Sequence, residues 1–226
     1  MIKTRAEIKS NAKEALREKY WYSVGVSLLF TVLMAIQTSI MMLLQNSEKY
    51  AAASIINLLL TLFFQIPVSV GLIRYFIKLG KGENAQVGDM FHIFKNGYTN
   101  VILTEIKQAV FIMLWSLLFL IPGIIKAYQY FMIDYMLAEN PALNHKRAFE
   151  ITKAVMAGNK WRTFVLGLSF IGWILLAGLT AGIGAIFLMP YTQETFAKYY
   201  LELKETAIEK GIATQEDFGG AVIIEN

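Results

Sequence analysis

Residues 114–137 read LWSLLFLIPGIIKAYQYFMIDYML, and this stretch decides how the rest of the chain is arranged. It is uncharged up to Pro122 and carries Lys126 and Asp134 beyond it. The pair Pro122-Gly123 either turns the chain between two membrane helices or kinks one long helix. That choice fixes the side of the membrane on which every later segment lies.

The distribution of basic residues favours the turn. With a turn at Pro122-Gly123, all of the 21 Lys and Arg residues except Lys49 and Lys126 lie on the side of the N-terminus. With one kinked helix, the basic residues after Ala138 move to the other side. The two sides of the membrane then carry nearly equal numbers of Lys and Arg residues. Because cytoplasmic loops are enriched in Lys and Arg, we expect a hairpin, with both termini in the cytoplasm. The main objection is that the second arm, 124–138, is short for a hydrocarbon core of about 30 Å.

Composition places the chain among polytopic membrane proteins. Hydrophobic residues make up 56% of the 226 residues and charged residues 17%, and the apolar residues form long blocks. The predicted fold is an all-α transmembrane helical bundle of about six spans in a single domain, 1–210, with amphipathic interfacial helices and a flexible tail, 211–226. The predicted spans are 21–44, 54–78, 101–121, 124–138, 163–179 and 185–203.

Several classes of function are disfavoured by what the chain lacks. There is no cysteine, and His92 and His145 stand apart without metal-ligand spacing. No nucleophile elbow, phosphate-binding loop or pair of carboxylates in one span is present, so we expect no enzyme, cofactor or metal site. The net charge of +4 comes from Lys and Arg beside apolar spans, which argues against nucleic acid as a partner.

Basic residues are concentrated on two predicted amphipathic helices. The first, 4–19, opens with a capping box formed by Thr4 and Glu7. The second, 141–157, has Asn140 as N-cap and proline at its first helical position. We expect both helices to contact lipid headgroups, although a solvated leader explains the first one equally well. The predicted headgroup contacts are Lys9, Lys13, Arg17, Lys146, Arg147 and Lys153.

One face of the predicted fourth span carries three polar side chains. Lys126, Tyr130 and Asp134 recur at four-residue spacing, which places them together on a continuous helix. Ionisable groups inside a membrane are usually paired or beside water. The set is therefore either a proton or cation site or, as we favour, a structural network that holds the hairpin.

The segments TRAEIKSNAKEAL, LWSLLFLIPGIIKAYQY, ITKAVMAGNKW and LSFIGWILLAGLTAGIGAIFLMPY occur in this order over 4–203. In order and spacing they resemble the domain-of-unknown-function 975 family. The resemblance implies a multi-pass protein of the cytoplasmic membrane of a Gram-positive bacterium. It implies no activity and no catalytic residue.

Two hypotheses follow for function. The leading one is a non-catalytic envelope protein that binds membrane lipids, a membrane-active peptide or a partner, which includes another membrane protein or a second copy of itself. The alternative is a small transporter or channel subunit that uses Asp134.

Overall fold

The computed structural model of the protein describes residues 3–45 and 48–220, and this part of the chain contains helices and no strands. The predicted all-α class is therefore confirmed for these residues. In chain order the elements are α1 (Arg5–Leu16), α2 (Tyr20–Leu44), α3 (Tyr50–Leu60), the π-helical turn η1 (Thr61–Gln65), α4 (Ile66–Gly80), the 3-10 turn η2 (Val87–Phe91), α5 (His92–Lys95), α6 (Tyr98–Leu118), α7 (Leu120–Gln129), α8 (Met132–Glu139), α9 (His145–Met156), α10 (Lys160–Leu168), α11 (Ile171–Leu179), α12 (Ile183–Glu209) and the 3-10 turn η3 (Glu216–Phe218).

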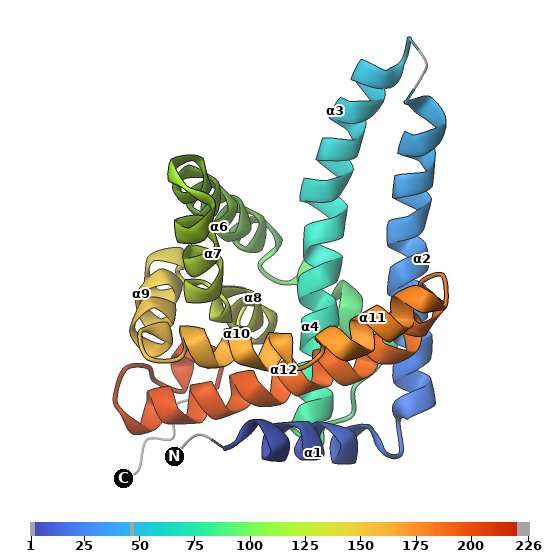
Figure 1. Ribbon diagram of the computed structural model, residues 1–226. Coiled ribbons are helices and arrows are strands. Elements are labelled where there is room, and N and C mark those ends of the chain that lie inside the picture. Colours follow the sequence, from blue (N-terminus) through green and yellow to red (C-terminus); the bar gives the residue numbers. More distant parts are fainter. Residues whose placement is uncertain (1–2, 46–47, 221–226) are drawn as a thin grey trace.

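Two helical hairpins rise from a common base, and a third lies across α4 and α2 (Figure 1). The chain goes out along α2 and returns through α3, η1 and α4; α6 pairs with α7, and α11 pairs with the first half of α12. The outer surfaces of the hairpins are apolar, as expected of surfaces that face lipid. Large exposed side chains on them include Ile36, Leu43, Ile55, Leu58, Leu117, Ile121, Leu175 and Leu179.

The base is a packed core of α1, α4, α8, α9 and the second half of α12. Helix α1 lies across α12 and α4 and buries Ile8, Ala12 and Leu16 against them (Figure 1). The predicted capping box is confirmed, because the backbone N–H of Thr4 donates to the Glu7 carboxylate at 2.6 Å and the Thr4 hydroxyl accepts from the backbone of Glu7. Lys3, just before α1, pairs with Glu202 of α12, so the start of α1 lies beside the second half of α12 (Figure 1).

Four helical segments are long and apolar enough to cross a membrane, judged by length and composition. They are Tyr20–Leu44, Tyr50–Gly80, Tyr98–Leu118 and Lys160–Leu179. The predicted sixth span, 185–203, is not among them, because polar residues such as Glu194 and Lys198 lie in its second half. The number of spans and the side on which the base lies remain predictions.

The prediction of one helix over 124–138 is wrong. Helix α7 ends at Gln129, and α8 begins at Met132 and packs within the base. The α7 arm has 10 residues and spans about 15 Å, roughly half of a hydrocarbon core. The α6–α7 hairpin is therefore too short on its return arm to cross a bilayer.

The chain reverses at Phe119, slightly before the predicted turn at Pro122-Gly123. Phe119 is extended, with φ −160° and ψ 149°, and separates α6 from α7. Pro122 falls in the first turn of α7, where its missing N–H is not required for a helical hydrogen bond. A Cβ at Gly123 would overlap the Ser116 side chain, so glycine lets the two arms approach closely. The two residues thus shape the hairpin without forming its tip.

The second basic helix begins later than predicted. Helix α9 starts at His145, and Asn144 is its N-cap, with a side chain that accepts from the Lys146 N–H at 2.9 Å. Asn140 instead donates to the carbonyl of Glu216 at 3.1 Å. Contact with the chain after α12 therefore engages the residue that was predicted to cap this helix.

Residues 211–220 are packed, which corrects the predicted flexible tail for this part. Ala213 and Phe218 are buried. Asp217 accepts from Arg147 Nη2 at 2.9 Å and from Arg147 Nε at 3.1 Å. Burial by itself would raise the pKa of Asp217, but the hydrogen bonds from Arg147 and the Thr214 backbone outweigh it, so the pKa is lowered. Residues 221–226 lie outside the described part of the chain.

Candidate functional site

The structure separates the three residues of the predicted polar face. The helix break between Gln129 and Met132 turns Asp134 away from Lys126. Lys126 Nζ lies 4.5 Å from the centre of the Trp115 ring, so it stays on the hairpin. Tyr130 is buried at the break. The spacing predicts a shared face only for an unbroken helix, and this condition is not met.

Tyr130 belongs to an aromatic cluster. Its ring packs edge-on against Phe149 at a centroid distance of 5.0 Å, and Phe111 lies 6.5 Å away. This cluster joins α6, α9 and the break between α7 and α8. Tyr130 therefore positions these elements, and a role in tuning Asp134 has no support from its contacts.

Asp134 contacts two polar side chains of α6 that were not predicted to lie near it from the sequence. Gln108 Nε2 donates to Asp134 Oδ1 at 3.0 Å, and the Glu105 carboxyl lies close to Asp134. Glu105 Oε1 and Gln108 Oε1 are buried and have no hydrogen-bond partner among the described residues. Two adjacent carboxylates repel each other, so this group suits a shared proton or a bound cation. The only signal in the sequence was the three-residue spacing of Glu105 and Gln108.

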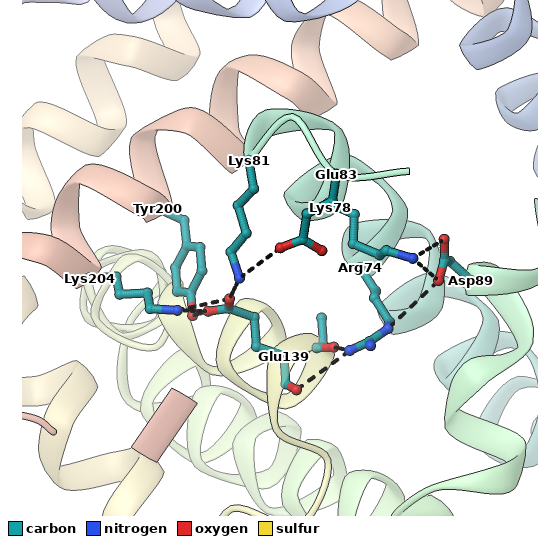
Figure 2. Close-up of polar contacts among 9 residues, drawn as sticks. Arg74, Lys78, Lys81, Glu83, Asp89, Glu139, Tyr200 and Lys204 are labelled. Atoms are coloured by element: carbon teal, nitrogen blue, oxygen red, sulfur yellow. Dashed lines mark hydrogen bonds and ion pairs between the residues drawn. The ribbon is translucent and has the colours of Figure 1, made fainter. Parts of the chain in front are cut away.

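A second polar cluster surrounds Glu139 at the end of α8 (Figure 2). Its carboxylate is 5% exposed and pairs with Lys81 and with Lys204, whose Nζ lies 2.8 Å from Oε2. The Tyr200 hydroxyl donates to the same oxygen at 2.5 Å. These groups satisfy one another, so the cluster ties α4, α8 and α12 together and leaves no donor set open to a ligand.

The same network continues along α4. Arg74 Nη1 donates to the carbonyl of Ala138 at 2.9 Å, and Lys78 Nζ pairs with Asp89 at 3.0 Å (Figure 2). Arg74 Nε also lies 3.9 Å from Asp89. The basic residues at the end of α4 therefore hold η2 and α8 in place.

The predicted headgroup contacts fall into two groups. On α9, Arg147 is engaged by Asp217, whereas Lys146 and Lys153 are exposed. Just after α1, Arg17 lines a hollow with Gly80 and Lys198, away from Lys9. Of the six predicted headgroup contacts, Lys9 and Lys13 are the two that lie close together.

Lys9 and Lys13 each lie on an aromatic ring. Lys9 Nζ is 4.0 Å from the centre of the Phe170 ring and donates to the Ser169 carbonyl at 3.1 Å, while Lys13 Nζ is 5.5 Å from the centre of the Tyr191 ring. Partial burial lowers the pKa of Lys9, and the neighbouring charges of Arg5 and Lys13 lower it further. An anion bound here would relieve that repulsion.

No three His, Asp or Glu side chains in the described ranges gather closely enough to hold a metal ion. A family model described as "Protein of unknown function (DUF975)" matches residues 1–128 and 117–207. Neither the functionally curated proteins nor the solved structures gave a match to this chain. The matched ranges together include every helix from α1 to α11 and nearly all of α12.

Proposed function

The chain belongs to the DUF975 family of proteins of unknown function, and from its geometry we propose that it is a non-catalytic protein of the bacterial cytoplasmic membrane that binds anionic lipid. The observation that carries the proposal is the pair Lys9 and Lys13. Both cations lie on aromatic rings, and none of the described carboxylates forms an ion pair with either one.

The position of α1 supports this proposal. It lies at the base, beside the hairpins whose outer surfaces are apolar (Figure 1). Its lysines therefore stand where the lipid-facing surface begins. Basic side chains at that depth meet phosphate groups, and each contributes about 1 kcal/mol near an anionic surface. Several other basic residues of the base, among them Lys204 and Arg147, already have acidic partners.

The test is the composition of the lipid that remains bound. We expect the full chain, purified from bacterial membranes in mild detergent, to retain anionic phospholipid enriched at least tenfold over the membrane of origin, since the two lysine contacts contribute about 1 kcal/mol each. Mass spectrometry of the extracted lipid measures the ratio of anionic to zwitterionic species. Bound lipid with the composition of the bulk membrane would contradict the proposal.

The cluster of Glu105, Gln108 and Asp134 favours a second candidate, a transporter or channel subunit. Its unpartnered oxygens supply ligands for a proton or a monovalent cation, as polar groups within membrane segments do in transport proteins. This candidate requires that water reach the cluster.

The absence of native cysteine makes that requirement testable. In variant Asp134→Cys, labelling of intact cells by a membrane-impermeant thiol reagent is expected if the cluster opens to the outside. Glu48→Cys and Ala142→Cys are the topology controls, and the predicted orientation requires the first to label and the second to stay silent. If position 134 stays silent even in opened vesicles, the transport candidate is rejected.

A further inference from the structure

An apolar groove of about 500 Å³ lies between the start of α2 and the α11–α12 hairpin. Its walls include Tyr20, Trp173, Leu176, Phe187, Leu188 and Tyr191. The Trp173, Leu176 and Phe187 side chains remain 57%, 56% and 43% exposed. The groove falls within the range of volumes found for small-molecule sites, and it opens on the surface that faces lipid.

The groove has a cationic end. Lys13 lines the groove and lies over the ring of Tyr191. The Tyr191 ring packs edge-on against Phe170 at 5.4 Å, and Phe170 lies beneath Lys9. Two lysines one helical turn apart are thus held side by side on two touching rings.

The acidic residues in α1 and just after it do not cancel this charge. Glu7 is engaged in the capping box with Thr4. Glu14 and Glu18 line a different hollow, which also includes Lys198. The side of α1 that meets the groove is therefore positive.

Two of the polar groups in the walls are already engaged within the protein. The Tyr20 hydroxyl donates to the Phe187 carbonyl at 3.0 Å, and the Thr180 hydroxyl donates to the Ala177 carbonyl at 2.7 Å. A peptide backbone in the groove would find few partners for its own N–H and C=O groups. An alkyl chain needs none, so the walls favour an acyl chain as occupant.

We propose that this groove is a binding site for an anionic phospholipid, with its phosphate between Lys9 and Lys13 and one acyl chain along Trp173 and Phe187. The proposal rests on the proposed function and names the site at which lipid is selected. Aromatic faces hold the lysine side chains in place, so the headgroup meets a preformed pair of cations.

Trp173 reports on the groove directly. The probe is the full chain with Trp21, Trp115 and Trp161 replaced by phenylalanine, reconstituted in phosphatidylcholine vesicles. Lipid with brominated acyl chains quenches tryptophan on contact. At equal mole fraction, brominated phosphatidylglycerol is expected to quench Trp173 more strongly than brominated phosphatidylcholine does.

Substitutions in this background locate the headgroup. The double variant Lys9→Gln/Lys13→Gln should lower the preference for phosphatidylglycerol at least tenfold, because two lysine contacts with the headgroup are lost. The double variant Lys9→Arg/Lys13→Arg keeps the charge and should keep the preference. Lys146→Gln/Lys153→Gln removes the same charge from α9 and should also keep it.

Each of the other possible outcomes contradicts the proposed lipid site. Equal quenching by the two lipids shows that the groove does not select headgroups, and a preference that survives Lys9→Gln/Lys13→Gln places the headgroup elsewhere. Shielding of Trp173 from both lipids means that protein or peptide covers the groove. If Trp173 shows no preference while the purified chain still retains anionic lipid, the site fails and the proposed function stands.

Discussion

Replacing Glu139 by glutamine should destabilise the protein by about 3 kcal/mol, because breaking a buried ion pair leaves its partner charge uncompensated. Glu139 is 5% exposed and Lys204 is 12% exposed, so water cannot take the place of the lost carboxylate. Glutamine keeps the size of the side chain and removes only its charge. The measurement is the midpoint of thermal unfolding in detergent, followed by circular dichroism.

Glu83→Gln is the matched control. Glu83 is 49% exposed and its nearest cation, Lys81, lies 3.9 Å away, so its removal should change stability by less than about 0.5 kcal/mol. Similar losses in the two variants would mean that the Glu139 cluster contributes no more than a surface pair.

The loss of stability in the Glu139→Gln variant, relative to the unchanged protein, should become smaller as the pH rises. Burial lowers the pKa of Lys204 from 10.5, and Glu139 opposes this shift. Without the carboxylate, folded Lys204 loses its proton at a lower pH than unfolded Lys204 does. The unfolded chain of the variant then binds more protons than the folded chain. The free energy of unfolding of the variant therefore rises with pH until the pH approaches 10.5. Unfolding midpoints at about pH 7 and about pH 9 test the sign.

The second large effect is expected at Gly71. A Cβ at this position would overlap the backbone carbonyl of Met90, so α4 and η2 could not keep their contact. Met90 is fully buried, and a backbone atom cannot move aside as a flexible side chain can. We expect Gly71→Ala to cost about 3 kcal/mol or more, at the upper end of the range for overpacking. Size-exclusion chromatography of the detergent extract should show little monodisperse protein.

Gly25→Ala controls for the substitution itself. Gly25 lies within α2, and nothing stands within 4 Å of its added Cβ. Because alanine is a better helix former than glycine, this variant should be unchanged or stabilised by up to about 1 kcal/mol. Normal yield for Gly71→Ala would show that η2 is free to shift.

Local patterns in the sequence predicted the first half of the molecule well. The span 21–44 corresponds to α2 at Tyr20–Leu44, since an uninterrupted apolar run of that length has few alternatives to a helix. Thr4 and Glu7 form the predicted capping box, because that interaction involves residues close in sequence. The expected helical hairpin around Pro122 is present as α6 and α7, with its reversal at Phe119.

The polar site could not be derived from spacing. Lys126, Tyr130 and Asp134 share a face only if the helix continues, and packing of Tyr130 against Phe149 accompanies its break. Asp134 then meets Glu105 and Gln108 of α6, a contact between elements that no local pattern encodes. The Glu139 cluster was not predicted for the same reason, because its contacts join α4, α8 and α12, which are distant in sequence.

The sequence by itself determined that the chain is helical, rich in apolar segments and basic at their ends, because hydropathy and charge are properties of consecutive residues. Tertiary structure alone decided which charges are neutralised. Arg147 and Lys204 are paired with acidic residues distant in sequence, whereas Lys9 and Lys13 meet aromatic rings. Partner choice depends on how helices pack, and that packing turns two of many lysines into a candidate lipid site.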